Sequence, residues 1–214
     1  MIHIERKAQN AVKNVLSFIY FSGNICIMYK IDHLLNANEE VGVIMKDFYV
    51  DLHIHIGRTA SGKPVKITGS KTLTLHTILQ CASSQKGLDM IGVIDCHSPE
   101  VLVEIEGLLK RGEMIELAEG GVRFQDTTLL LGSEIEVYDS YCHGPIHVLA
   151  YFPTVEKMKA FSDWMSNHVK NISLSSQRIY VEGRALQQKV YEYDGLFVPA
   201  HVFTPFKSLY GKGV

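Results

Sequence analysis

The sequence lacks the cysteine pattern of disulfide-rich and zinc-knuckle proteins. Its 214 residues contain only four cysteines, and no two of them form a C-x-x-C pair. They are Cys26, Cys81, Cys96 and Cys142. Such wide spacing argues against a disulfide framework and a structural zinc knuckle, and it favours a reducing compartment.

An excess of charge of one sign is also absent. Lysine and arginine together number 21 and aspartate and glutamate 23, so the formal net charge is -2. A globally basic nucleic-acid-binding protein is therefore not indicated, although a local basic patch remains open. One stretch fits such a patch, because the sequence from Leu52 through Leu88 has no acidic residue. Its basic residues are Arg58, Lys63, Lys66, Lys71 and Lys86.

The sequence has no apolar run that is long enough to span a membrane. The strongest candidate, Val15 to Tyr29, is about five residues shorter than a membrane-spanning helix needs, and polar residues at 22 and 24 interrupt it. No small-x-small cleavage site follows, which argues against a signal peptide. We therefore expect a buried strand or helix at this place and a soluble, cytoplasmic protein.

Short apolar runs alternate with helical periodicity from residue 48 onward. Strands are expected at 48–54, 90–95, 128–134, 146–151 and 196–200, and helices at 72–86, 99–111, 154–169 and 176–192. This alternation predicts an α/β fold with a parallel sheet or barrel. Five strands do not close a seven- or eight-stranded barrel, so we expect the chain to be a fragment of one.

The first part of the chain differs from the rest, since it has neither this rhythm nor a motif. A strong strand pattern begins directly after Met45 and Lys46. We therefore expect the functional domain to cover residues 45–214. Residues 1–44 are interpreted as an appended segment or as the product of a wrongly assigned start.

Side chains that can bind metal ions stand at or near the ends of the predicted strands. In chain order they are Asp51, His53 and His55, then Asp95 and His97, then Glu134, His147 and His201. Because the carboxyl ends of parallel strands converge on one face of a barrel, we expect these groups to meet there. Imidazole and carboxylate ligands without thiolates suit Zn²⁺, Mn²⁺ or Fe²⁺ and favour a hydrolytic site over a structural one.

The spacing within the first strand strengthens this interpretation. Strand alternation places Asp51, His53 and His55 on the same side of the strand. Burying three polar side chains carries a heavy desolvation cost unless something binds them. A lone histidine is usually structural or exposed, but an inward-facing i, i+2 pair needs a partner, and a metal ion is a suitable one.

Five motifs resemble those of the PHP (polymerase and histidinol phosphatase) phosphoesterases, and they occur in the family's order. They are Asp51-Leu52-His53-Ile54-His55, Asp95-Cys96-His97, Gly132-Ser133-Glu134, His147 and His201. The second motif is usually T-D-H, so Ile94 and Cys96 are departures. The resemblance covers residues 48–205, and five motifs in order make it specific. It implies an incomplete, distorted (β/α)7 barrel with parallel strands.

Two longer segments narrow the resemblance. Residues 57–66 (GRTASGKPVK) and 201–206 (HVFTPF) are similar to endonuclease Q, a PHP enzyme that nicks DNA. That enzyme cuts on the 5′ side of deaminated bases, such as uracil and hypoxanthine, and of abasic sites. The resemblance therefore implies a metal-dependent phosphodiesterase of DNA repair with damaged DNA as its partner.

The resemblance also implies roles for individual residues and two or three divalent ions, Zn²⁺, Mn²⁺ or Mg²⁺. His53 and His55 would hold one metal with Glu134 as a bridge, His147 and His201 a second, and His97 would help to hold a third. Asp51 and Asp95 are expected to support catalysis by orienting the histidines. Arg58, Lys63 and Lys66, in the loop after the first strand, are expected to contact backbone phosphates.

One family feature is missing. PHP enzymes carry a late Asp-x-His motif that completes the metal cluster, and nothing after His201 supplies it. We therefore expect a C-terminally truncated domain. Two alternatives stay open: a small-molecule phosphatase of the histidinol-phosphate type, which needs a compact pocket, and a non-catalytic metal-binding remnant.

Overall fold

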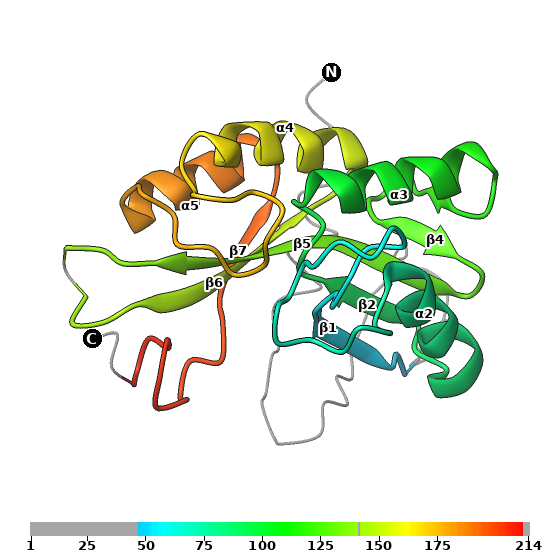
Figure 1. Cartoon of the computed structure of the whole chain (residues 1–214), viewed down its shortest axis with the longest axis horizontal. Helices are drawn as coiled ribbons and strands as arrows, with labels where there is room; N and C mark the ends of the chain where they lie inside the picture. Colours follow the sequence, from blue (N-terminus) through cyan, green and yellow to red (C-terminus); the bar gives the residue numbers. More distant parts are fainter. Residues whose placement is uncertain (1–46, 141, 212–214) are drawn as a thin grey trace, which may run out of the picture.

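A computed structural model describes residues 47–140 and 142–211. The expectations for residues 1–44, namely an appended segment and a buried element at 15–29, lie outside the described residues. The described chain forms a seven-stranded mixed sheet that does not close into a barrel (Figure 1). Within these residues, every helix is too short or too polar to span a lipid bilayer.

The elements follow the predicted order. The strands are β1 (Val50–Ile54), β2 (Met90–Val93), β3 (Ile115–Glu116), β4 (Val122–Phe124), β5 (Thr127–Val137), β6 (Ile146–Phe152) and β7 (Leu196–Pro199). The helices are α2 (Leu75–Gln80), its π-helical continuation η1 (Cys81–Lys86), α3 (Pro99–Lys110), α4 (Val155–Ser166) and α5 (Gly183–Glu192). The short strands β3 and β4 were not predicted, and α5 begins at Gly183 rather than at residue 176.

The strand directions correct one expectation. β1, β2 and β5 are parallel, as predicted, but β6 runs antiparallel to β5, and β7 runs antiparallel to β6. The short connection at residues 138–145 explains the first reversal, because a parallel neighbour requires a crossover of a dozen or more residues. The α/β class and the open sheet agree with the prediction, whereas a uniformly parallel sheet was wrong.

The reversal still leaves the predicted metal ligands at one end of the sheet. Glu134 lies in the carboxyl half of β5. Since β6 runs back along β5, its second residue, His147, pairs with Glu136 of β5. β7 then runs in the same direction as β5, and His201 follows its carboxyl end.

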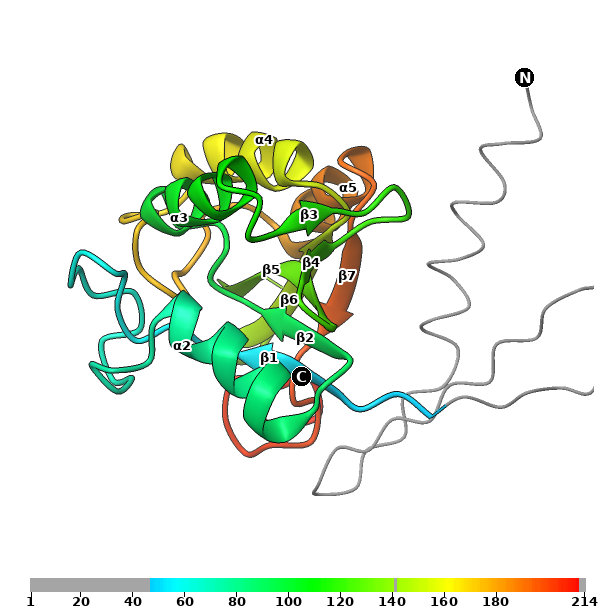
Figure 2. The ribbon, with the colours of Figure 1, turned by 90° about the vertical axis from the view of Figure 1, so that its right-hand side faces the viewer.

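Helices α3, α4 and α5 cover one side of the sheet, while α2 lies beside β1 and β2 (Figure 2). α3 starts with Pro99 in its first turn, where a missing backbone N–H costs nothing. α4 starts at the cap residue Thr154, whose side chain accepts a hydrogen bond from the backbone N–H of Lys157 at 3.2 Å. These signals fix where the two helices begin above the sheet.

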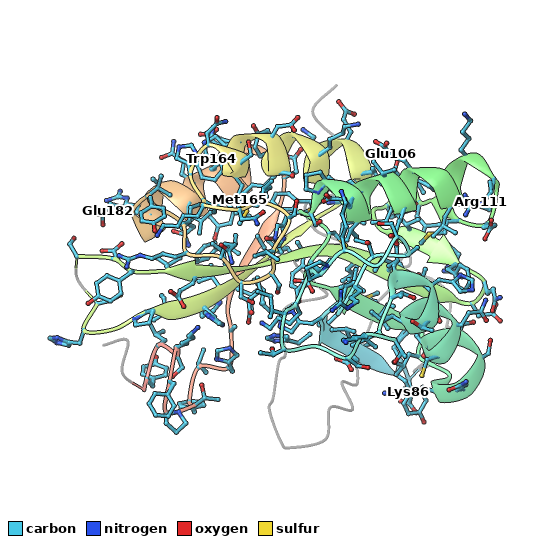
Figure 3. All side chains as sticks on the ribbon, in the orientation of Figure 1. Lys86, Glu106, Arg111, Trp164, Met165 and Glu182 are labelled. Carbon is cyan, nitrogen blue, oxygen red and sulfur yellow. The ribbon has the colours of Figure 1, made fainter. Side chains whose placement is uncertain are left out.

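The main core lies between the helix layer and the sheet, where side chains fill the space (Figure 3). Leu131 and Ile135 of β5 and Phe161 and Met165 of α4 are fully buried there. The rings of Phe161 and Phe152 have centroids 4.5 Å apart. Because β5 is buried along nearly its whole length, it forms the central support for the residues at its carboxyl end.

Candidate metal centre

Four histidines surround the carboxylate of Glu134, which is only 2% exposed. Its Oε1 lies 3.2 Å from His53 Nε2, 3.0 Å from His147 Nδ1 and 3.6 Å from His201 Nε2, and its Oε2 lies 3.4 Å from His55 Nε2. His53 lies in β1 and His55 directly after it, His147 lies at the start of β6, and His201 follows β7. Folding thus gathers residues that are up to 148 positions apart, from 53 to 201, around one carboxylate.

The cluster divides into two groups that share Glu134. His53, His55 and Glu134 form the first, and Glu134, His147 and His201 form the second. Within each group the candidate ligand atoms lie within 4.8 Å of one another. Two nitrogens and one oxygen at this spacing suit a divalent cation such as Zn²⁺ or Mn²⁺, and a shared carboxylate suits a pair of them.

His147 shows that the residues present fit a cation. Both of its ring nitrogens are buried, and neither makes a hydrogen bond of acceptable geometry with any described residue. Nδ1 nevertheless lies 3.0 Å from Glu134 Oε1. Buried polar nitrogens are rarely left without a partner, because the loss of hydration is costly. A cation bound by Glu134 and His147 Nδ1 would satisfy that nitrogen, whereas Nε2 lies 3.6 Å from Glu136 Oε2.

The same contacts shift the ionisation of the cluster. Burial raises the pKa of Glu134, but the close imidazoles of His147, His53 and His55 lower it more, to well below the usual range. Burial lowers the pKa of His55, but its contacts with Asp95 and Glu134 raise it to about 9. At neutral pH without metal, Glu134 is therefore an anion and His55 carries a proton that a metal ion must displace.

The two predicted orienting carboxylates have different contacts. Asp95 is fully buried, its Oδ2 lies 3.1 Å from His55 Nδ1, and it accepts a hydrogen bond from the backbone N–H of Ile56 at 2.7 Å. This directs His55 Nε2 toward Glu134. Asp51 accepts a hydrogen bond from the backbone N–H of His53 at 3.2 Å. Asp51 therefore contacts the backbone of β1, whereas Asp95 contacts the ring of a candidate ligand, His55.

His97 lies outside both groups, although the sequence predicted it as a metal ligand. Its Nδ1 lies 2.9 Å from Ser133 Oγ, and its Nε2 lies 3.2 Å from the carbonyl oxygen of Leu174. Both ring nitrogens thus have protein partners. Burial lowers the pKa of His97, so the neutral ring is favoured.

Of the three basic residues predicted to bind phosphate, only Lys66 reaches the cluster. Its Nζ lies 3.5 Å from Glu134 Oε2 and 3.2 Å from His55 Nε2. Arg58 instead donates to the carbonyl oxygen of Gly62 at 2.8 Å, within its own loop. Lys63 forms an ion pair with Glu100 of α3 at 2.9 Å.

Sequence reasoning missed the serines of the α4–α5 connection. Ser176 donates a hydrogen bond to Glu134 Oε2 and accepts one from Lys66 Nζ at 2.7 Å, while Ser175 Oγ lies 3.0 Å from His55 Nδ1. Residue 176 was predicted as the first residue of a helix, but its φ of 52° lies in the left-handed region. The adjacent serines were the available signal, because serine favours turns over helix interiors.

Fold and site together define a mixed α/β protein with a paired histidine–carboxylate centre, and in fold the chain is endonuclease Q-like. It is similar to an endonuclease Q solved with a 27-mer duplex substrate that has an abasic lesion at the active site, with a TM-score of 0.60 and 27% identity over 76% of this chain and 37% of that one. The lesion-specific endonuclease PfuEndoQ from Pyrococcus furiosus gives a TM-score of 0.59 and 26% identity over 76% and 36%.

Two curated proteins are similar in sequence. The uncharacterized protein YqxK of Bacillus subtilis (strain 168) is 61% identical over 170 residues, which is 79% of this chain and 44% of that protein. The uncharacterized protein MJ0043 of Methanocaldococcus jannaschii is 29% identical over 157 residues, 73% of this chain and 16% of that protein. The chain thus spans less than half the length of these relatives. No family model matches it.

Proposed function

We propose that the chain carries the metal centre of a phosphodiesterase that nicks DNA on the 5′ side of deaminated bases or of abasic sites. The observation that carries this proposal is the position of Glu134, shared between two histidine groups at one end of the sheet. The similarity to an endonuclease Q solved with a DNA duplex supports DNA as the substrate class.

Divalent cations bound by these groups would acidify a water molecule and offset the negative charge of the phosphate. The chain's own residues prepare the place for them. Asp95 holds the ring of His55 by Nδ1, so Nε2 faces Glu134 and would act as a ligand once its proton and Lys66 are displaced. Glu134 remains ionised over the physiological pH range, so it can serve both groups.

We assign to Lys66 the role of binding the scissile phosphate. Its ammonium group is already beside Glu134 and lies on the loop that follows β1. A lysine here can donate to a non-bridging phosphate oxygen once cations have replaced it as the partner of the carboxylate. Arg58 and Lys63 are proposed to contact phosphates farther along the strand, which requires each to leave its present partner. We assign no cation to His97, because both ring nitrogens are bonded within the protein.

A nicking assay tests the proposal. Labelled duplexes that contain uracil, hypoxanthine, an abasic site or no lesion are incubated with the chain in Mn²⁺, Zn²⁺ or Mg²⁺. We expect a cut 5′ of the lesion and none in the undamaged duplex. Glu134→Gln should lower the rate by at least about a hundredfold, since it weakens both groups at once. Glu106→Gln is the control, because Glu106 is paired with Lys159 on the surface at 2.8 Å.

The other outcomes are equally informative. Hydrolysis of a small phosphomonoester without nicking would assign the chain to the phosphatases. Stoichiometric metal uptake with neither activity would make it a metal-binding module without catalysis. Absence of metal uptake would contradict the proposal, because Glu134 and the four histidines around it would then not be metal ligands.

A further inference from the structure

Two exposed tyrosines flank an arginine at one side of the metal centre. The guanidinium carbon of Arg178 lies 4.6 Å from the ring centroid of Tyr138 and 5.6 Å from that of Tyr180. Tyr138 is 46% exposed and Tyr180 55%, and Arg178 is exposed as well. The three side chains are called the Tyr–Arg–Tyr cluster below.

The backbone connects this cluster directly with Glu134. Strand alternation places residues 134, 136 and 138 on the same face of β5 and its extension, so Tyr138 projects on the side of the metal ligands. Tyr138 is four residue steps of extended chain from Glu134, which corresponds to about 13 Å. This is the axial length of about four stacked nucleotides.

The second segment of the cluster runs alongside β5. Glu136 pairs with Arg178 in parallel orientation, and the backbone N–H of Ile179 donates to the carbonyl oxygen of Glu136 at 2.9 Å. At the other end of this segment, Ser176 contacts Glu134 itself. Two adjacent segments thus lead outward from the carboxylate, and both end in the Tyr–Arg–Tyr cluster.

The chemistry of the cluster matches an unpaired nucleotide. Tyrosine rings stack on the face of any base, and a guanidinium stacks on bases or donates to phosphate oxygens. All three side chains are exposed, so a base can reach the tyrosine rings and a phosphate can reach the guanidinium. We propose that the Tyr–Arg–Tyr cluster is a stacking site for a nucleobase of the DNA strand, a few nucleotides from the phosphate that is cut. The inference rests on the proposed function.

Alanine substitutions test the inference through the split between KM and kcat. Tyr138→Ala and Tyr180→Ala should each raise KM for the lesion-containing duplex about tenfold and leave kcat unchanged, because base stacking acts on binding. Tyr138→Phe and Tyr180→Phe keep the ring and should restore KM. Arg178→Ala should weaken DNA binding and make it less dependent on salt concentration.

Tyr191→Ala is the matched control, because Tyr191 is also 55% exposed but lies on α5, where its hydroxyl accepts a hydrogen bond from Gln187 at 3.3 Å. It should leave KM unchanged. Thermal unfolding of each variant shows whether it folds. Unchanged KM in both folded alanine variants would overturn the inference while the proposed function stands.

If the unmodified chain does not nick, the proposed function fails. Fluorescence anisotropy with single-stranded DNA then tests the stacking site separately. Equal affinity of the unmodified chain and both alanine variants for this DNA would overturn the inference.

Discussion

Glu134 shows how a single residue depends on its surroundings. A buried carboxylate is costly unless charges or donors compensate it, and four imidazoles, Lys66 and Ser176 surround this one. In the metal-free chain, protonated side chains therefore compensate the negative charge of Glu134. Bound cations would take over this role. The protonation of His55 can be followed through the pH dependence of the chain's stability.

We expect the metal-free chain to lose stability as the pH rises from 6.5 to 9. The folded pKa of His55, about 9, is above its ordinary value of 6.5. Protonated His55 therefore adds stability that is fully present below pH 6.5 and is lost as the pH rises through 9. The difference between a pKa of 6.5 and one of about 9 corresponds to at most about 3.5 kcal/mol. Thermal unfolding in a chelator between pH 6 and 9.5 measures it.

His55→Asn should flatten this pH dependence. His76→Asn is the control, since His76 is exposed on α2. Unfolding midpoints that fall equally in both variants over this pH range would show that His55 is not the group responsible.

Cys96 is expected to be unreactive in the folded chain. Burial raises its pKa to about 12, and its thiol donates to the carbonyl oxygen of Val93 at 3.1 Å. At pH 8, only on the order of one thiol in ten thousand is then ionised, and the thiolate is the reactive form. Iodoacetamide labelling followed by peptide mass spectrometry should modify Cys81 and Cys142, which are partly exposed, but should modify Cys96 only in urea. Equal labelling of all three without denaturant would contradict this.

At the scale of the elements, close contact between strands positions β1. A Cβ at Gly92 in β2 would lie 2.6 Å from the carbonyl oxygen of Leu52 and 2.9 Å from its Cα. Neither atom can move without shifting β1, which carries His53 and leads directly to His55. The absence of a side chain at residue 92 therefore sets the spacing between β1 and β2.

Gly92→Ala should lower the free energy of unfolding by about 2 kcal/mol or more, because β1 and β2 must separate. Gly107→Ala is the opposite case, since in α3 the added Cβ meets only the flexible end of Arg111 at 3.2 Å. We expect it to stabilise the chain by about 0.5–1 kcal/mol, which is the usual helix preference for alanine. Urea unfolding of both variants is the measurement, and a stable Gly92→Ala chain would disprove the close-contact argument.

At the scale of the whole molecule, the candidate metal ligands come from β1 and the residue after it, from β5, from β6 and from the segment after β7, so bound cations would connect all of these segments. Bound cations should therefore stabilise the entire chain. At a free metal concentration about a hundred times Kd, the gain is about 2.7 kcal/mol, or a rise in Tm of about 5–10 °C.

The rise in Tm on metal binding should depend on how many of the two histidine–carboxylate groups remain intact. His201→Ala removes a ligand from one group and should keep part of the rise in Tm, whereas Glu134→Gln affects both groups and should keep the least. Glu106→Gln should behave like the unmodified chain. Thermal scans with and without Mn²⁺ or Zn²⁺ make the comparison, and an equal rise for Glu134→Gln would show that Glu134 is not shared between cations.

Part of the tertiary arrangement was beyond reach of the sequence. The direction of β6 was predicted wrongly because strand periodicity carries no information on direction; only the short length of the link at residues 138–145 does. The very short β3 and β4 carry too few residues for a periodic signal. The positions of Lys66, Ser176 and His97 depend on contacts between segments that are distant in the chain.

The sequence by itself determined which residue types stand at the strand ends, because alternation and apolar periodicity are local properties. From these it predicted the α/β class, the order of the main elements and the five residues that the structure gathers, His53, His55, Glu134, His147 and His201. Only the tertiary structure decided that His97 turns to Ser133 and Leu174 and that Lys66 turns inward. Those choices depend on which partner lies within hydrogen-bond distance after folding, and no local pattern encodes that distance.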